Sequence, residues 1–350
     1  MRFAAVCCLV LIASSLPNLG SAFALELKIS HQWAEGADGR DRAARVFVQE
    51  VEARAKDLKF RIFPKSSLNI EPRDILGALR SNRLDMAIYP LAYAVGEVPE
   101  FSLVGLPGLV PDLDAARALR GSAIQTTLQE LAESNGFRII GWWWNPGGFF
   151  ARRREISDPK SVEGLKMRAA DPLFEMMLHK AGASVTNIPS SEAYRALQSG
   201  SLDAIIASYE GFTSLRLYEQ ARYATLGSTL FMSLTPLVVS LATWNALTLE
   251  QRAAVEEAAD ISEVYFDALQ RAAERRVAMN LIGVGGSVHR MTRADFLQWL
   301  ELAQRTAWLE YAKKNPRAQT LLLTTLQRIL EKFGSKDDLI DSIYREDPKD

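Results

Sequence analysis

Residues 164–172 read GLKMRAADP and place one arginine, Arg168, at the end of a short apolar stretch. The pattern predicts a short strand that ends at Arg168, followed by a helix over 173–181. An arginine at a strand end beside a cleft offers a planar fork of N–H groups, which matches the two oxygens of a carboxylate. An ion pair with Asp171 or Glu192 explains the same arginine equally well from the sequence alone. Arg168 is therefore a candidate anchor for an organic acid, with a structural ion pair as the alternative.

Strands and helices alternate on both sides of this stretch, which predicts an α/β fold. Expected strands lie at 25–29, 59–63, 84–89, 138–144 and 202–207, and expected helices at 40–55, from Pro72 onward and at 191–199. The alternation favours a mainly parallel sheet with helices on both faces. Because it occurs in two clusters along the chain, we expect two α/β lobes.

A different pattern begins at Thr248. Thr248 and Gln251 have the spacing of a capping box, and the sequence then continues to about Ile282 without Gly or Pro. A single helix of this length is unusual in a globular protein and would brace two lobes together. Further helices are expected at 292–313 and 317–333.

The N-terminus predicts secretion. Arg2 precedes an apolar run over 3–13, and Ala22–Phe23–Ala24 has the small-x-small pattern of a signal peptidase site. We therefore expect residues 1–24 to be a Sec signal peptide, cleaved near Ala24, and the mature protein to lie in the periplasm. Both cysteines, Cys7 and Cys8, would leave with the signal peptide, so no disulfide is expected.

Composition and motifs exclude several kinds of function. Of 350 residues, 48% are hydrophobic and 24% charged, and the net charge of −1 argues against a nucleic-acid partner. The three histidines, His31, His179 and His289, are isolated, which argues against a metal site. No phosphate-binding loop, nucleophile elbow or zinc motif is present, so neither a cofactor nor an enzymatic activity is expected.

Four stretches resemble the solute-binding proteins of tripartite ATP-independent periplasmic (TRAP) transporters, the DctP-like family. They are EPRDILGALRSNRLDMAIYPLAYAVGEVPEF (71–101), ISDPKSVEGLKMRAADP (156–172), SSEAYRALQSGSLDA (190–204) and LYEQARYATL (217–226). The resemblance extends from Leu27 to beyond Tyr311. It implies a two-lobed periplasmic binding protein with its ligand cleft between the lobes and a long helix over about 248–282 that spans both. We expect residues 25–143 and 234–273 in lobe I, and 144–233 and 274–350 in lobe II.

The resemblance also implies a binding site. In this family the arginine of the GLKMR-type motif pairs with the ligand carboxylate, and here that arginine is Arg168. The other candidate ligand contacts are Gln32, Trp33, Tyr89, Trp144, Asn145, Phe149, Ser208, Tyr209 and Glu210. A second arginine found in members that bind acidic sugars is replaced by Gly148, and a family asparagine by Ala207. Room at Gly148 and the nearby aromatic rings favour a monocarboxylate with an apolar or aromatic body.

The implied function is capture of an organic acid by hinge closure and its delivery to a TRAP membrane permease, which an ion gradient drives. We expect a monomer that is not an enzyme. A periplasmic sensor that feeds a signalling receptor is the main alternative, because ligand capture would look identical. A periplasmic hydrolase or isomerase is a weaker alternative, since the scattered histidines offer no acid–base pair.

Overall fold

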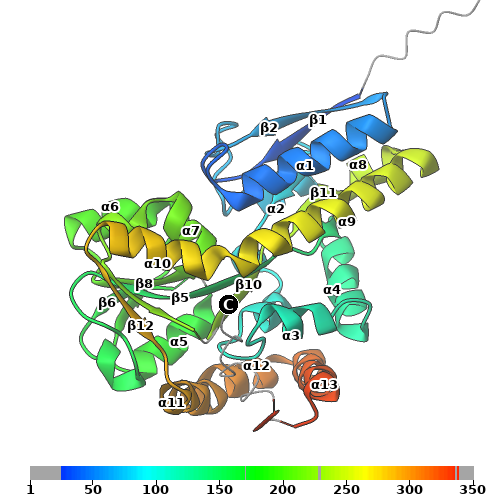
Figure 1. Cartoon of the computed structure of the whole chain (residues 1–350). Coiled ribbons are helices and arrows are strands. Elements are labelled where there is room, and N and C mark those ends of the chain that lie inside the picture. The colour runs from blue at the N-terminus through cyan, green and yellow to red at the C-terminus, as the bar shows by residue number, and fades with distance from the viewer. Residues whose placement is uncertain (1–24, 170, 228–229, 336, 339–350) are drawn as a thin grey trace, which may run out of the picture.

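The computed structural model describes residues 25–169, 171–227, 230–335, 337 and 338. They form two α/β lobes, each built on one β-sheet, with a long helical rod across both (Figure 1). The two-lobed α/β prediction is confirmed. The expected signal peptide, 1–24, and most of the chain beyond α13 lie outside the described residues.

Lobe I contains a five-stranded sheet in the order β2-β1-β3-β11-β4. Its strands are β1 (Leu25–Ser30), β2 (Leu58–Phe63), β3 (Met86–Ile88), β4 (Phe137–Gly141) and β11 (Leu237–Ser240). The first three strands are parallel, whereas β11 runs antiparallel to both of its neighbours. The helices of lobe I, apart from the long rod, are α1 (Gly39–Arg54), α2 (Ile75–Arg80), α3 (Leu113–Ala118), α4 (Ala123–Ser134) and α8 (Leu241–Ala246).

Lobe II contains a seven-stranded sheet in the order β12-β9-β5-β8-β6-β7, with β10 also paired to β5. Its strands are β5 (Trp144–Ala151), β6 (Lys166–Arg168), β7 (Ser184–Thr186), β8 (Ala204–Ser208), β9 (Tyr223–Leu226), β10 (Phe231–Leu234) and β12 (Ser287–Arg290). Its connecting helices are α5 (Pro172–Lys180), α6 (Ala193–Ser199) and α7 (Tyr209–Ser214). β5 is antiparallel to β8, β9 and β10, as β11 is to its neighbours in lobe I. Both sheets are therefore mixed, and the expectation of mainly parallel sheets is wrong. Local sequence patterns show that a strand exists but do not give the direction of a distant partner.

Two extended segments join the lobes side by side. The expected strand over 138–144 is in fact interrupted at Trp142 and Trp143, where the chain passes from β4 to β5. The return crossing joins β10 to β11, and Thr235 N donates to Trp143 O at 2.9 Å, so the two crossings are hydrogen-bonded to each other. The Trp143 ring also stacks on Phe266, at 5.3 Å between ring centroids. The backbone therefore passes between the lobes at two adjacent points that are hydrogen-bonded to each other.

The long rod consists of two helices, α9 (Leu249–Arg271) and α10 (Ala273–Gly283), with Ala272 between them (Figure 1). The capping box of Thr248 and Gln251 is confirmed, but the expected single helix over 248–282 is broken. The break falls where the packing partner changes, since α9 lies on α1 of lobe I and α10 lies on α7 of lobe II. Nothing in the local sequence signals it, because neither Gly nor Pro is present.

The C-terminal helices pack beneath both lobes. They are α11 (Arg293–Ala303), a π-helical turn at Gln304–Trp308, α12 (Leu309–Lys314) and α13 (Pro316–Phe333), close to the expected ranges. Trp308 Nε1 donates to Pro107 O and Trp299 Nε1 donates to Ser157 O, both at 2.9 Å. Short 3₁₀ turns occupy Leu91–Tyr93, Pro99–Gly105, Pro159–Val162, Ser190–Glu192 and Leu217–Glu219. The division into 25–143 with 234–273 and 144–233 with 274–350 remains our proposed division of the lobes.

Candidate functional site

A cavity of about 60 Å³ lies between the lobes, next to the ends of several strands. Lobe I contributes Trp33, which follows β1, and Pro90, which follows β3. Lobe II contributes Arg168 from the end of β6 and Ser208 from the end of β8. The carboxyl ends of strands in α/β sheets are the usual place for a ligand, because backbone and loop groups converge there. The remaining lining residues are Arg40, Ala92, Tyr93, Gly105, Asp171, Ser190, Ala193, Ile205, Ala207, Gly211, Leu215, Leu217, Phe231, Ser233 and Thr235.

Arg168 is buried in this cavity, with 3% of its surface exposed. Two backbone carbonyls orient its guanidinium, which donates from Nε to Ile188 O at 2.8 Å and from Nη1 to Ile206 O at 3.2 Å. No described carboxylate lies within ion-pair distance of it, so the alternative pairing with Asp171 or Glu192 is not formed. Burial lowers the pKa of Arg168 below its ordinary value, although Tyr93 and the more distant Glu192 act in the opposite direction. A buried guanidinium without an ion-pair partner is costly in free energy, so an anionic ligand would stabilise it.

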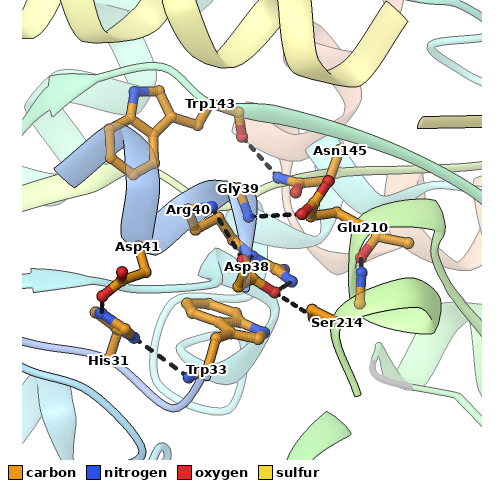
Figure 2. A network of polar contacts seen from close by, with 12 residues as sticks. His31, Trp33, Asp38, Gly39, Arg40, Asp41, Trp143, Asn145, Glu210 and Ser214 are labelled. Carbon is orange, nitrogen blue, oxygen red and sulfur yellow. Dashed lines mark hydrogen bonds and ion pairs between the residues drawn. The ribbon is translucent and has the colours of Figure 1, made fainter. Parts of the chain in front are cut away.

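Arg40 faces the same cavity from lobe I, but its charge is already balanced. Its Nε and Nη2 donate to the two carboxylate oxygens of Asp38 at 2.7 and 2.8 Å. The guanidinium lies over the ring of Trp33, at 3.8 Å from the centroid, as Figure 2 shows. Arg40 was not among the predicted site residues, because nothing in ADGRD (37–41) distinguishes it from a surface arginine.

Trp33 is held in place by a buried pair behind it. His31 and Asp41 are fully buried, with His31 Nε2 at 3.0 Å from Asp41 Oδ1. Trp33 N donates to His31 Nδ1 at 3.3 Å, which leaves the ring proton on Nε2, facing Asp41 (Figure 2). Burial opposes ionisation of Asp41, but hydrogen bonds from His31 and Arg45 outweigh it and lower the pKa of Asp41. Asp41 thus orients His31, and His31 holds the backbone of Trp33, whose ring forms one cavity wall.

Asp171 is a second buried ionisable group in the lining, with 4% of its surface exposed. Its Oδ1 accepts from Leu173 N at 2.8 Å and so caps helix α5. Among the described residues, no basic side chain lies within ion-pair distance of it. Burial raises the pKa of Asp171 to about 6, even though hydrogen bonds from the backbone of Leu173 act in the opposite direction. The group carries a negative charge in the cavity only above that pH.

Tyr93 joins the two lobes at the edge of the cavity. Its hydroxyl accepts from Gln32 Nε2 at 3.2 Å and from Ser190 N at 3.4 Å. Gln32 thus reaches the site through Tyr93 and is not itself part of the lining. Tyr89 points into the lobe I core, edge-on to Tyr93 and Phe137. The family resemblance implied a ligand contact near Tyr89 and Pro90. The tyrosine that lines the cavity is instead Tyr93, about one turn further along the chain.

The structure brings Arg168, Trp33 and Ser208 together, and it places the other candidates elsewhere. Trp144 lines a separate groove beside α9, and Asn145 is buried with Nδ2 donating to Trp143 O at 3.0 Å. Phe149 stacks on Trp299, and Tyr209 packs edge-on against Phe150. Glu210 is 1% exposed and contacts lobe I, outside the lining.

Gly148 provides no space in the cavity. A Cβ atom built on it would lie 2.3 Å from Thr225 O and 3.3 Å from Tyr209 Cε1, because β5 passes closely between its neighbours there. The expectation that Gly148 makes room for a ligand is therefore wrong. The same contact excludes a second arginine at this position. Ala207, in place of the family asparagine, does line the cavity.

Gly148→Ala is expected to destabilise the fold by about 1–3 kcal/mol, because the methyl group must displace the Thr225 backbone. Equilibrium denaturation in urea measures the change. Gly96→Ala is the matched control, since a Cβ atom there meets nothing within 4 Å. Equal midpoints for the two variants would contradict the close approach of β5 and β9.

The family follows from comparison with known proteins. The model of bacterial extracellular solute-binding protein, family 7 (DctP), matches residues 29–315. The chain belongs to this family. A solute-binding protein from Albidiferax ferrireducens is 34% identical over 327 residues, which cover 91% of this chain and 96% of that protein.

Solved structures of TRAP periplasmic solute-binding proteins agree with the fold. A TRAP periplasmic solute-binding protein from Rhodoferax ferrireducens, with bound malonate, has a TM-score of 0.85 and 33% identity, and covers 87% of this chain and 99% of its own. A TRAP protein from Chromohalobacter salexigens with bound D-glucuronate has a TM-score of 0.80, 20% identity and coverage of 86% and 99%. The latter supports the fold alone. The predicted TRAP solute-binding protein, with two lobes and a long helix, is thus confirmed.

Family 7 proteins are periplasmic transport proteins that bind small carboxylates and work with membrane permease subunits. Within the part of this family 7 protein that the structure describes, no helix is both long and apolar enough to cross a membrane. The same part contains no group of three or more His, Cys, Asp or Glu placed to hold a metal ion.

Proposed function

We propose that this protein captures a compact monocarboxylate with an apolar or aromatic body and delivers it to a TRAP permease. The observation that carries the proposal is Arg168, a buried guanidinium in the cavity between the lobes with no described carboxylate partner. Its two bonds to backbone carbonyls fix its plane, so that a bidentate contact with a carboxylate requires little reorganisation.

The charge balance of the cavity favours one carboxylate over two. Arg40 is neutralised by Asp38, and Asp171 is itself an acid that is ionised above about pH 6, so among the described lining residues Arg168 is the basic group left for an anion. A second carboxylate would be buried without a partner, at a cost of several kcal/mol. Ile205, Leu217 and Phe231 form apolar walls that suit a hydrocarbon or ring as the rest of the ligand.

Capture would proceed by closure of the lobes about the crossings at Trp142–Trp143 and Thr235–Pro236. In the open form the carboxylate meets Arg168, which lobe II holds rigidly. Trp33, Arg40 and Tyr93 of lobe I then cover the ligand and exclude water, which strengthens the charge interaction. The closed form is the state that a permease would recognise.

The wider proposal is a secreted, monomeric transport protein. Residues 1–24 would be a Sec signal peptide, cleaved near Ala24, and the mature protein would act in the periplasm without a nucleic-acid partner. It would bind its ligand without chemical change and without a cofactor. A sensor for a signalling receptor uses the same capture step, so solute uptake by cells with and without this gene separates the two functions.

A thermal-shift screen of residues 25–350 tests the ligand class. The panel contains 3-methyl-2-oxobutanoate and phenylacetate as apolar monocarboxylates, malonate as a dicarboxylate, and D-glucuronate and D-glucarate as sugar acids. A ligand that binds only the folded protein raises its stability by RT ln(1 + [L]/Kd), so the largest shift marks the tightest binder. We expect an apolar monocarboxylate to give it. A larger shift with D-glucarate or malonate would overturn the assignment to monocarboxylates, and no shift with any acid would overturn carboxylate capture.

A further inference from the structure

Two buried carboxylates meet the start of helix α1 without facing the ligand cavity. Asp38 is the N-cap of α1 and is fully buried, and Glu210 of α7 is 1% exposed. Ser214 Oγ donates to Asp38 Oδ2 at 2.5 Å, and Gly39 N donates to Glu210 Oε1 at 2.5 Å (Figure 2). Neither Ser214 nor Glu210 belongs to the cavity lining.

Both contacts connect the lobes. Asp38 and Gly39 follow β1 of lobe I, whereas Glu210 and Ser214 lie on α7, directly after β8 of lobe II. The first peptide N–H groups of a helix have no partner within it, and the helix dipole adds positive potential there, so a carboxylate from the other lobe suits this point well. Arg276 of α10 donates to Glu210 Oε2 at 2.7 Å and holds the side chain against α1.

The contacts are also linked to the cavity through Arg40. Asp38 accepts from Ser214 of lobe II and, at the same time, positions the Arg40 guanidinium that lines the cavity over Trp33. Burial opposes ionisation of Asp38, but the adjacent Arg40 guanidinium outweighs it and lowers the pKa of Asp38. The connection therefore remains charged over the physiological pH range.

We propose that Asp38, Gly39, Glu210 and Ser214 form an interlobe latch, which sets ligand affinity by stabilising the closed state and does not contact the ligand. The inference rests on the proposed function, because it assumes that closure retains an acid at Arg168. Asp38 is a positioning residue in this scheme, acting on the cavity through Arg40. The latch should alter affinity for every ligand by the same factor and leave the order of preference unchanged.

Gly39→Ala tests the latch on the lobe I side. A Cβ atom on Gly39 would lie 2.9 Å from Glu210 Cδ, so the carboxylate must withdraw and its bond to Gly39 N lengthens. The φ angle of Gly39 is not positive, and alanine favours a helix, so α1 itself is not weakened. Gly77→Ala in α2 of the same lobe is the matched control, because a Cβ atom there meets nothing within 4 Å.

Ser214→Ala tests the lobe II side by removing one donor. Ser287→Ala is its control, since Ser287 Oγ also donates to a carboxylate, Glu155 Oε1 at 3.0 Å, but both partners lie in lobe II. Calorimetry with 3-methyl-2-oxobutanoate, phenylacetate and malonate gives the affinities. For each acid that the wild type binds, we expect Gly39→Ala and Ser214→Ala to weaken binding about tenfold, with both controls within about twofold of wild type.

Three results would overturn the latch: wild-type affinity in both test variants, an equal loss in the controls, or a loss that differs between acids. Hydrogen exchange in the first turn of α1, measured without any acid, provides a readout that needs no ligand. Faster exchange in Ser214→Ala than in Ser287→Ala supports the latch, and equal exchange contradicts it. If the wild type binds no acid, the proposed function fails while this second readout still decides the latch.

Discussion

Arg168→Ala is expected to abolish carboxylate capture and leave a folded protein. Truncation removes the charge that would meet the ligand, and a buried pair that loses one member costs about 2–5 kcal/mol, or roughly thirtyfold to several thousandfold in Kd. Ile188 O and Ile206 O lose their donors as well, so we expect a stability loss of about 1–2 kcal/mol. Arg168→Lys should lie between, because lysine keeps the charge but not the planar fork.

The measurement is calorimetric titration with the acid that gives the largest thermal shift. Arg154→Ala is the control, because Arg154 also belongs to lobe II and donates to a backbone carbonyl, Glu163 O at 3.2 Å, but lies at the surface. We expect wild-type affinity in this control. Tight binding that survives in Arg168→Ala would show that Arg168 has a structural role and does not bind the ligand. That result would contradict the proposed function.

Asp171→Asn is expected to stabilise the protein at neutral pH and to do nothing in acid. The pKa of Asp171 is about 6 in the folded protein against a usual 3.8, so the folded state holds the proton more tightly than the unfolded chain does. The stabilisation from Asp171 is therefore complete below about pH 4 and is lost as the pH rises through 6. At about 1.4 kcal/mol per pKa unit, the loss approaches roughly 3 kcal/mol.

Asparagine avoids this loss because it has no charge and still accepts from Leu173 N as an N-cap. Urea denaturation between pH 4 and 8 should show Asp171→Asn above the wild type only at the higher pH values. Asp158→Asn is the control, since Asp158 also caps a short helical turn, by accepting from Ser161 N, but is only partly buried. Parallel stability curves for wild type and Asp171→Asn would contradict the raised pKa.

The affinity for a carboxylate ligand should depend on pH through the same ionisation of Asp171. Above pH 6 the Asp171 carboxylate repels an incoming carboxylate in the shared cavity, so affinity for an acid should fall between pH 5 and pH 8 in the wild type. Titrations at both pH values should give equal affinities for Asp171→Asn. A pH dependence that persists in this variant would assign it to another group.

The sequence predicted the parts of this protein that local patterns encode. The strand at Arg168, the helix that follows it (α5) and the capping box at Thr248 all depend on residues a few positions apart. Trp142–Trp144 was predicted as the end of one strand, because a change of sheet leaves no mark in an apolar run. The break at Ala272 was missed for the same reason, since the change of packing partner decides it.

The site shows the same limit. Family resemblance led to Arg168, Trp33 and Ser208, which the structure brings to one cavity. Arg40 was missed because its importance comes from a fold that brings it over Trp33 and beside Asp38. Glu210 was predicted as a ligand contact, but it lies outside the cavity lining and accepts from Gly39 N, 171 positions away in the chain. A single sequence contains no signal for such a pair.

The position of β11 in its sheet has a consequence for how the protein folds during synthesis. β11 lies between β3 and β4, although residues 237–240 are synthesised long after both neighbours. During synthesis, β3 and β4 therefore each lack the neighbour that separates them in the finished sheet until β11 has been made. In lobe II, β9 likewise lacks one neighbour until β12 has been made. Such distant pairings form slowly, because a large loop must close first. Neither sheet can therefore be completed until most of the chain has been made, so folding of this protein is expected to finish after synthesis and not strand by strand during it.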